Sequence, residues 1–399
     1  MGRIVKLICV SPDNNNKFYS MTENSDGSWT AHWGRVGAQG DSTTYPANQW
    51  DKKYKEKIKK GYKDITDLVS VEKETDEPEL KIAGISRLVQ DMVNFLQNCA
   101  RGVVKQNYTV RVADVTLKQV DAAQEIIDRL ALLSRAKWDK KDVNASLLDL
   151  YRTIPRKMSN TKIFLIQDDD KPDKFQRILS SEQDLLDVMR GQVSTQTQTI
   201  KTKDAHELKL DIILREATPE EIDEIRRNTD LDLTRVNHVC RVTNNRPGLS
   251  YASFFNQPRS RELLLYHGSR NENWWSIINT GLKIRPSNAI HTGSMFGDGL
   301  YFANKARKSI GYTSLSGSYW ASGNANKAYL ALYQVNVGHM WDVLANRYNG
   351  SMSSLNLHKV KTAGYDTVFA KGGADLRNDE HITYEADRCT IKYLIELKS

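Results

Sequence analysis

The chain has 399 residues, a length that predicts two or three domains rather than one. Its formal net charge of +8 permits a polyanionic partner such as nucleic acid without requiring one. The four cysteines are widely spaced and form no CxxC pair, so we expect no zinc site, no disulfide framework and a reducing intracellular compartment. Because no apolar run is long enough for a secretory signal or a membrane span, we expect no membrane partner.

Residues 1–71 predict a small β-rich domain with one helix. Val5–Val10 is a candidate strand, and Ser25–Ser28 predicts a hairpin turn between the candidate strands Lys17–Thr22 and Trp29–Trp33. The last of these strands runs into the sequence WGRVGAQG, which places three glycines after an aromatic strand.

A lysine-rich segment follows and predicts the helix of this domain. It contains seven lysines and one glutamate between Lys52 and Lys63, while Trp50, Tyr54 and Ile58 recur every four positions. This pattern indicates one apolar stripe on an otherwise basic helix. The basic face is most simply solvated, and contact with nucleic-acid phosphates is an equally open alternative.

An acidic stretch, Glu72–Glu79, contains Pro78 and no large apolar residue, so we expect a linker there. Residues 80–191 then predict an all-α bundle, because apolar residues recur on successive helical faces. These faces comprise Ile85, Leu88, Val89, Met92, Phe95 and Leu96; Val120, Ala123, Ile127 and Leu130; Leu147, Leu148, Tyr151 and Ile154; and Leu185, Leu186 and Met189.

Capping signals predict where the helices of this bundle begin and end. Thr116 and Gln119 form a candidate capping box, and Pro155 ends the third helix. Ser180–Gln183 predicts the start of the fourth helix, and Gly191 predicts its end.

After a polar stretch, Gln192–Asp204, the pattern becomes mixed. Thr218–Glu221 is a strong helix start, with a threonine cap, a proline at the first helical position and a glutamate three residues after the cap. The strand candidates are Leu208–Leu214, Val236–Val242, Glu262–Tyr266, Leu330–Val337, Thr367–Ala370 and Ile391–Leu397. Many strands with few long helices predict an α+β domain with a largely antiparallel sheet, so the whole chain is a multidomain α+β protein.

Three residues in the last third of the chain form a candidate catalytic set: His267, Tyr301 and Glu380. Each of the three follows or lies in a β-like run, and Glu380 does so in a polar approach to the final strand. This set suits cleavage of the nicotinamide–ribose bond of NAD, which passes through an oxocarbenium-like state as in glycoside chemistry. His267 can hydrogen-bond one ribose, and Glu380 can accept from the other and polarise an incoming hydroxyl. Alone, each residue is more simply structural.

Neighbouring residues fit the nicotinamide end of the same ligand. The backbone of Gly268 can approach a planar carboxamide closely, and Ser269 adds a hydroxyl. Tyr301 and Tyr312 flank a short basic run, and a tyrosine face stacks well on a pyridinium ring. The glycines near residue 297 match neither a dinucleotide-binding fingerprint nor a phosphate-binding loop, so we reject both sites.

Five segments of the chain resemble one enzyme family. LLLYHGSRNENWWSIINTGLKI, GSMFGDGLYFANKARKSIGYT and NDEHITYEADRCTIKYLIELK closely resemble the catalytic domain of the poly(ADP-ribose) polymerases. Upstream, WGRVG resembles the signature of the WGR domain that accompanies it, and the bundle is similar to the family's helical regulatory domain. The resemblance implies a WGR DNA-binding domain at 1–71, a helical regulatory domain at 80–195 and an ADP-ribosyltransferase domain at 205–399.

The resemblance also implies a role for each residue of the site. His267 would bind the adenine-ribose hydroxyl, Gly268 and Ser269 would hold the carboxamide, and Glu380 would orient the nicotinamide ribose and activate the acceptor. The remaining NAD-binding residues would be Asn273, Lys283, Arg285, Tyr301, Ala303, Lys308, Ser309 and Tyr312. The loop Gly281–Gly299 would close over the donor.

DNA contact would fall to the first segment. The resemblance places Trp33 and Arg35 near a DNA end, and we expect Lys52 and Lys53 of the basic helix to bind DNA as well. From the residues alone, Arg35 is exposed enough by its glycine neighbours to reach nucleic acid, whereas Trp33 could be purely core. No zinc-finger cysteines precede this segment.

The chain departs from the family pattern in two places, the first near the phosphates and the second near the acceptor. Lys283, with Arg285 nearby, stands where the best-known members carry an arginine, and Asn378 and Asp379 precede Glu380 where an aromatic residue and an asparagine are usual. The second departure leaves both polymer formation and transfer of a single ADP-ribose open.

The resemblance therefore implies an NAD-dependent ADP-ribosyltransferase that modifies protein acceptors, itself included, and growing ADP-ribose chains. DNA breaks with a 5′-phosphate would stimulate it by loosening the helical domain, and it would act in the nucleus of a eukaryote or in the cytoplasm or nucleoid of a bacterial or virus-infected cell. The alternatives are a mono-ADP-ribosyltransferase of the same family and a catalytically weak scaffold that binds DNA ends.

Overall fold

The computed structural model describes residues 2–66, 80–134, 138–171, 173–197, 199–201, 206–208, 212–244, 260–284, 295–344, 351–373 and 376–399. The chain divides into two compact units, residues 1–76 with 101–196 and residues 77–100 with 197–399. The predicted linker Glu72–Glu79 lies outside the described residues. No helix in the described ranges combines the length and the apolar character that a membrane span needs.

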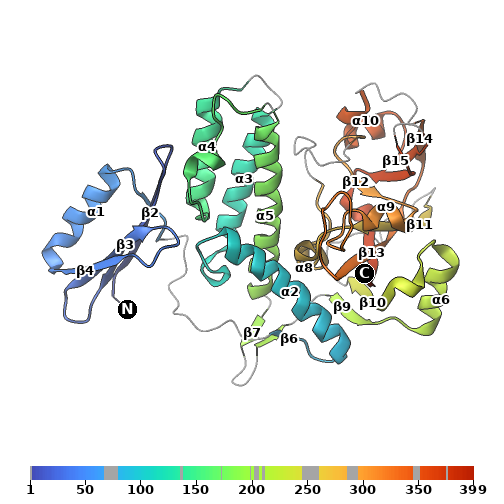
Figure 1. Ribbon diagram of the computed structural model, residues 1–399, viewed down its shortest axis with the longest axis horizontal. Coiled ribbons are helices and arrows are strands. Elements are labelled where there is room, and N and C mark those ends of the chain that lie inside the picture. Colours follow the sequence, from blue (N-terminus) through green and yellow to red (C-terminus); the bar gives the residue numbers. More distant parts are fainter. Residues whose placement is uncertain are drawn as a thin grey trace. The chain divides into compact units, whose positions relative to one another are not determined.

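The first unit begins with a five-stranded antiparallel sheet in the order β4-β3-β2-β1-β5 (Figure 1). Its strands are β1 (Ile4–Ser11), β2 (Asn15–Glu23), β3 (Trp29–Arg35), β4 (Asp41–Tyr45) and β5 (Lys63–Asp64). The predicted hairpin between β2 and β3 is confirmed, and Gly27 takes the positive φ of 82° that this turn requires.

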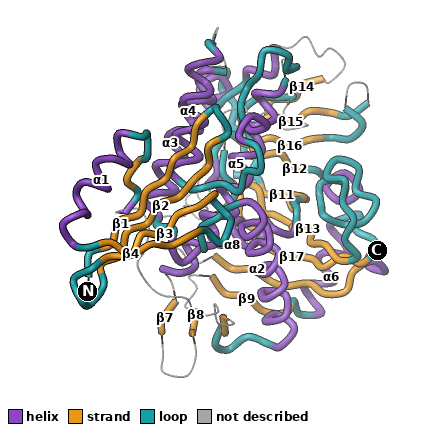
Figure 2. Tube along the Cα trace, turned by 60° about the vertical axis from the view of Figure 1, so that its left-hand side comes forward, coloured by secondary structure: helices purple, strands orange, loops and turns teal. Residues whose placement is uncertain are grey.

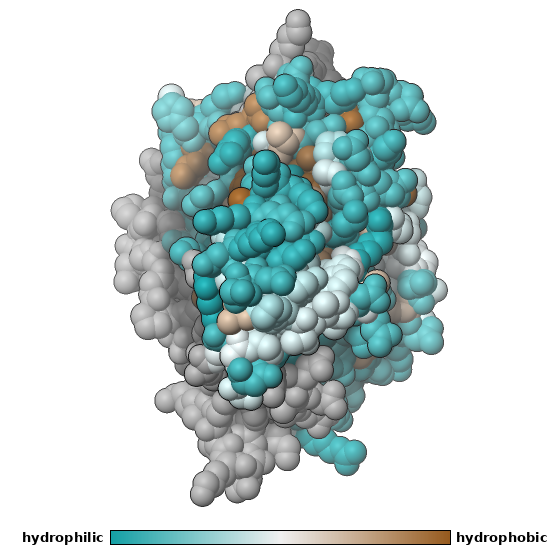
Figure 3. All heavy atoms as spheres, turned by 90° about the vertical axis from the view of Figure 1, so that its left-hand side faces the viewer, coloured by the Kyte–Doolittle hydropathy of each residue, from teal (hydrophilic) through white to brown (hydrophobic). Residues whose placement is uncertain are grey.

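The basic helix is α1 (Trp50–Lys59). Trp50 is buried in the core of the sheet domain and Tyr54 packs against that core, whereas Ile58 is 40% exposed. The apolar stripe is therefore buried at Trp50 and partly buried at Tyr54 but exposed at Ile58, one residue before α1 ends at Lys59. Figure 3 shows the face that lies on the left of Figure 1, where α1 is, and its coloured surface is mostly hydrophilic.

Helices make up the rest of the first unit. They are α3 (Leu117–Leu133), α4 (Lys140–Thr153), α5 (Lys174–Thr197) and the last residues of α2 (Arg87–Asn107). The capping box is confirmed, since Thr116 Oγ1 accepts from the Gln119 backbone and the Gln119 side chain accepts from the Thr116 backbone. The helix before Pro155 ends at Thr153, as predicted.

The predicted bounds of the fourth helix are wrong at both ends. α5 begins before Ser180 and continues past Gly191, because Phe175 and Leu179 extend its apolar face backward and Val193 extends it forward. Burial of these side chains outweighs the local capping signal. The same burial makes the first residues of the predicted polar stretch helical.

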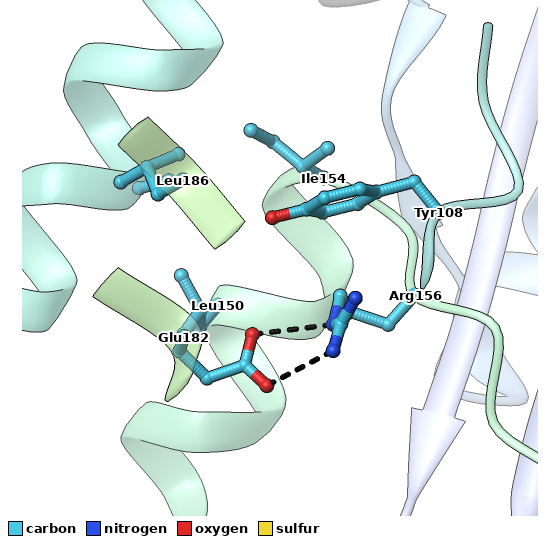
Figure 4. Close-up of a pocket in the computed structure, with 7 residues that line it drawn as sticks. Tyr108, Leu150, Ile154, Arg156, Glu182 and Leu186 are labelled. Atoms are coloured by element: carbon cyan, nitrogen blue, oxygen red, sulfur yellow. Dashed lines mark hydrogen bonds and ion pairs between the residues drawn. The ribbon is translucent and has the colours of Figure 1, made fainter. Parts of the chain in front are cut away.

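A buried ion pair lies among these helices. Arg156 and Glu182 have side chains 4% and 6% exposed, with Arg156 Nε 3.2 Å from Glu182 Oε2. Figure 4 shows the two groups facing each other beside Tyr108, whose ring the guanidinium also contacts at 4.8 Å. Arg156 Nη1 donates to the carbonyl oxygen of Asn107 at 2.8 Å, and Asn16 Nδ2 of the sheet domain donates to the Arg156 carbonyl oxygen at 3.1 Å. Arg156 thus links its own segment to those of Asn16, Asn107 and Glu182 in the first unit.

The second unit contains two larger sheets, whose strands are seen in Figure 2. The first has the order β11-β13-β17-β10-β9 and is antiparallel throughout; its strands are β9 (Ile212–Glu216), β10 (Val236–Asn244), β11 (Glu262–Gly268), β13 (Lys327–Asn336) and β17 (Cys389–Lys398). The second has the order β12-β16-β15-β14; its strands are β12 (Leu300–Phe302), β14 (Met340–Leu344), β15 (Thr367–Lys371) and β16 (Glu380–Thr383). Only the β14–β15 pair in these two sheets is parallel, so the largely antiparallel α+β fold is confirmed.

The remaining elements of this unit are shorter. A small sheet has the order β6-β8-β7, with β6 (Leu80–Lys81), β7 (Thr199–Lys201) and β8 (His206–Leu208). The helices are α6 (Pro219–Asn228), α8 (Asn271–Thr280), α9 (Ala306–Ile310) and α10 (Leu357–Thr362), and α6 begins at the predicted cap Thr218. The single strand predicted over Leu208–Leu214 is wrong, because β8 and β9 belong to different sheets.

The first part of α2 belongs to the second unit rather than to the bundle predicted from the sequence. Val89, Met92 and Leu96 are buried in one cluster with Trp274 and Trp275 of α8. The predicted apolar face is therefore present, but it covers the core that carries α8.

Candidate active site

Three strand ends meet in the second unit and position the candidate residues. The end of β11 joins the end of β12 by two hydrogen bonds, from Tyr266 N to Ala303 O at 2.8 Å and from Ala303 N to Tyr266 O at 3.0 Å. In the second sheet Phe302 lies opposite His381, so the register brings Ala303 beside Glu380. His267, Tyr301 and Glu380 therefore stand on three adjoining strand ends, as the candidate set requires.

His267 is half-buried at the end of β11 among the rings of Trp274, Phe302 and Tyr333. Its Nδ1 lies 3.0 Å from the carbonyl oxygen of Tyr301. Because a carbonyl only accepts, Nδ1 carries the proton and Nε2 is left as an acceptor. Burial lowers the pKa of the imidazole, so it stays neutral at pH 7.

Gly268 is held against α9 so closely that no side chain fits. A Cβ at this position would lie 1.8 Å from the carbonyl oxygen of Ser309. Next to it, Ser269 Oγ accepts from Asn273 Nδ2 at 3.1 Å, which joins two more predicted residues across the start of α8. Backbone and hydroxyl groups of residues 268, 269 and 309 therefore gather at one place.

Glu380 is the first residue of β16 and is 4% exposed. The expectation that it lies in a polar approach to the final strand is wrong, because it begins a strand of the other sheet. Its Oε1 accepts from Lys308 Nζ of α9. Its Oε2 is buried and makes no hydrogen bond to any residue that the structure describes.

Lys308 is the charged partner of this carboxylate, and its side chain is 13% exposed. Burial lowers the pKa of the ammonium to about 8, while the neighbouring Asp379 carboxylate acts in the opposite direction. The site thus combines a buried cation with a buried carboxylate oxygen that is available to a ligand hydroxyl.

Tyr301 has a hydroxyl group committed to the protein. It donates to Gly297 O at 2.9 Å and accepts from Phe296 N at 3.0 Å, which anchors the last residues of the predicted loop Gly281–Gly299. Tyr312, two residues after α9, stacks on Trp320 with ring centroids 6.0 Å apart and an interplanar angle of 17°, and burial raises the pKa of its phenol. The sequence pattern did not identify Trp320, because no spacing links it to Tyr312.

The remaining predicted NAD-binding residues are Lys283 and Arg285. Lys283 follows α8 and is exposed. Arg285 and most of the predicted closing loop lie outside the described residues.

The predicted DNA-binding residues all lie in the first unit. Lys52 is exposed on α1, and Lys53 pairs with Glu56 at 3.4 Å. Trp33 is partly buried in β3 and stacks on Tyr19. The guanidinium of Arg35 donates to Ser159 O at 2.6 Å and to Asn14 Oδ1 at 3.0 Å, so it already links the sheet domain to the helical segment of the same unit.

Comparisons with known proteins find similar sequences. Residues 220–399 match the poly(ADP-ribose) polymerase catalytic domain. A poly(ADP-ribose) polymerase-like protein, 100L of Invertebrate iridescent virus 6, is 37% identical over 136 residues, which cover 34% of this chain and 70% of the relative.

Two cellular relatives extend the comparison. Poly(ADP-ribose) polymerase 2 of Zea mays is 26% identical over an alignment of 477 residues, which covers 96% of this chain and 68% of the relative. Poly(ADP-ribose) polymerase 2 of Homo sapiens is 29% identical over 167 residues, 36% of this chain and 28% of the relative. The similarity to the maize protein therefore includes the segments that precede the catalytic domain.

Proposed function

The chain belongs to the poly(ADP-ribose) polymerase family, and on this premise we propose that it transfers ADP-ribose from NAD to proteins, itself included, and onto growing ADP-ribose chains. Family membership makes it an NAD+ ADP-ribosyltransferase. The acceptors, the product length and the stimulation by DNA belong to the proposal.

One observation carries the catalytic part of the proposal. Oε1 of Glu380 accepts a hydrogen bond from Lys308, whereas the buried Oε2 has no hydrogen-bond partner among the described residues. A buried carboxylate oxygen without a partner is costly unless a ligand supplies the donor. A hydroxyl of the nicotinamide ribose, or the hydroxyl of an acceptor, would satisfy it.

The other residues fit the rest of NAD. The backbone of Gly268 with the hydroxyls of Ser269 and Ser309 would hold the carboxamide, and the ring of Tyr312 would stack on the pyridinium with Tyr301 across from it. The Nε2 lone pair of His267 would accept from a hydroxyl of the adenine ribose. Further contacts would come from Asn273, Lys283, Arg285 and Ala303.

The reaction then follows from where charge develops. The bond between ribose C1′ and the nicotinamide nitrogen breaks, and the electron pair leaves with nicotinamide. The acceptor oxygen forms the new bond to C1′ and passes its proton to Oε2 of Glu380, which acts as the general base and later releases it to solvent. Glu380 stabilises the positive ribose and accepts a hydrogen bond from the acceptor, while Lys308 holds the carboxylate in place.

We propose that residues 1–71 bind DNA strand breaks bearing a 5′-phosphate and that the helical residues 80–195 restrain catalysis until they do. The exposed lysines of α1 and the match to the maize relative over 96% of the chain support this. The bonds from Arg35 to Ser159 and Asn14 offer a route by which contact at the sheet domain alters the helical segment.

Incorporation of labelled NAD with blunt, nicked, 5′-phosphorylated and no DNA tests the proposal. We expect incorporation to rise with broken DNA, a long smear of modified protein on a gel, and near-complete loss in Glu380→Gln. A discrete shift in place of a smear would establish the mono-ADP-ribosyltransferase alternative. Unchanged NAD consumption in Glu380→Gln would favour a DNA-binding scaffold whose turnover comes from elsewhere.

The DNA part is tested separately by salt dependence. If Lys52 and Lys53 contact phosphates, the double change to alanine weakens DNA binding and reduces the slope of log K against log salt by about 0.9 per lost contact. Lys118→Ala, an exposed lysine of α3, serves as the control and should leave the slope unchanged. An unchanged slope in the double variant would remove α1 from the DNA interface.

A further inference from the structure

Asp379, the residue before Glu380, joins three strand ends through one carboxylate. Its Oδ2 accepts from Asn304 Nδ2 at 3.0 Å, and its Oδ1 accepts from the backbone nitrogen of Gly372 at 2.9 Å. Asn304 follows β12, Gly372 follows β15, and Asp379 leads into β16. The start of β16 is therefore fixed to the ends of both strands that flank it in the sheet.

These bonds lie where the reacting groups are placed. Asn304 opens the turn that enters α9, and α9 carries Lys308 and Ser309. The residue after Asp379 is Glu380, the partner of Lys308. A bond from position 304 to position 379 therefore ties the segment that supplies the cation to the strand that supplies the carboxylate.

We infer that Asp379 and Asn304 form a clip that positions Lys308 against Glu380, and that Asp379 is a positioning residue for ADP-ribosyl transfer. The inference rests on the proposed function of Glu380. Displacement of a catalytic group by about 1 Å can lower the rate on the order of a hundredfold. A hydrogen bond that joins the segment carrying Lys308 to the strand carrying Glu380 can therefore affect kcat.

The clip makes a specific chemical demand. An ionised carboxylate only accepts hydrogen bonds, so Asp379 needs a donor at each of its oxygens, which Asn304 Nδ2 and Gly372 N supply. An asparagine at 379 can still accept from Gly372 N and can donate to Asn304 once the Asn304 amide rotates. Two carboxylates, at 304 and 379, would repel each other and open the clip.

Four variants separate the clip from the charge. Asp379→Ala removes both hydrogen bonds. Asn304→Asp places a second carboxylate against that of Asp379. Asp379→Asn keeps the bonds without the charge. The double variant Asn304→Asp/Asp379→Asn restores both hydrogen bonds and places the single negative charge at position 304 instead of position 379.

We expect Asp379→Ala and Asn304→Asp to lower kcat by about tenfold or more with the KM for NAD within about twofold. Asp379→Asn and the double variant should keep kcat within about threefold of the unmodified chain. The alkaline decline of kcat should also begin at a lower pH in Asp379→Ala and Asp379→Asn, because Lys308 loses one of its two anionic neighbours and its pKa falls, while Glu380 remains. Melting temperatures of all variants identify any that do not fold.

Asp232→Ala is the matched control, since Asp232 accepts from Thr234 N at 3.0 Å in an exposed turn of the same unit. An active Asp379→Ala, or a double variant no better than Asn304→Asp, would overturn the clip. An inactive unmodified chain would instead overturn the proposed function. An active unmodified chain in which Asp379→Ala melts normally and loses kcat, and in which the double variant recovers it, establishes the clip.

Discussion

Lys308 determines the charge state of the site at the scale of single residues. Its pKa is lowered to about 8, so the ammonium loses its proton as pH rises through that value, and Glu380 then loses its cationic partner. We predict that kcat of the unmodified chain falls on the alkaline side near pH 8. A profile of kcat between pH 6 and pH 10 measures this.

Substitution separates the charge of Lys308 from its shape. Lys308→Met should lower kcat by about a hundredfold, since a transition-state charge contact of this kind contributes on that scale, whereas Lys308→Arg should retain part of it. A Lys308→Met chain with the same pH profile and rate as the parent would contradict the assigned role.

Gly268 gives a second prediction at this scale. Gly268→Ala places a methyl group where the Ser309 carbonyl oxygen lies, 1.8 Å from the new Cβ, so either β11 or α9 must move. We expect a loss of about 1–3 kcal/mol in stability and a large rise in the KM for NAD. Thermal unfolding and steady-state kinetics measure both.

The control is Gly102→Ala on α2, where the new Cβ meets nothing within 4 Å. It should be neutral or slightly stabilising, because alanine favours a helix more than glycine does. Equal damage at both positions would argue against the close approach of α9.

The sequence could single out the candidate residues, but it could not predict which side chains contact them. His267, Tyr301 and Glu380 stand in a recognisable order, and flanking glycines indicate close backbone approach. The bond from Asn304 to Asp379 joins positions 75 residues apart and depends on sheet register, and the stacking of Trp320 on Tyr312 depends on a loop path. No local pattern encodes either.

At the scale of elements, the ion pair between Arg156 and Glu182 holds the helices of the first unit together. Glu182→Gln leaves a buried guanidinium without its counter-charge, so we predict a loss of about 3–5 kcal/mol in unfolding free energy. Denaturant unfolding of the full chain measures it.

The matched variant is Arg156→Met/Glu182→Leu, which replaces both charges by apolar groups of similar volume. It should recover most of the loss, because removal of both partners leaves no buried charge. An equally unstable double variant would mean that the bond from Arg156 to Asn107 O, or its contact with Tyr108, carries the stability instead.

Element boundaries show what sequence patterns leave out. Ser180 and Gln183 have the right spacing for a cap, yet both lie inside α5 because Phe175 and Leu179 are buried before them. Glu380 was expected in the polar approach to the final strand. Pairing with Ala370 of β15 supplies the strand. In both cases tertiary burial decides the local structure.

At the scale of the whole molecule, α2 makes the limits of the proposed regulatory region testable. Deletion of residues 80–195 removes Val89, Met92 and Leu96 from the cluster around Trp274 and Trp275, whereas deletion of 101–195 with a flexible linker keeps them. We predict that the first protein melts at a markedly lower temperature, since each such side chain stabilises by about 1.5–3 kcal/mol.

Thermal melts and binding of a hydrophobic dye compare the two deletions, and DNA-independent NAD turnover is measured in parallel. The shorter deletion should be stable and active without DNA if residues 101–195 provide the restraint. Low, still DNA-dependent turnover in that protein would contradict the restraint.

The path of the chain through the second unit has a consequence for its synthesis. That unit is assembled from residues 77–100 and 197–399, so the apolar face of α2 is made long before the α8 tryptophans that cover it. At about 5–20 residues per second the delay is on the order of ten seconds or more. During translation the first unit can already be complete while the apolar face of α2 is still uncovered, and such an exposed apolar surface favours aggregation until α8 is made.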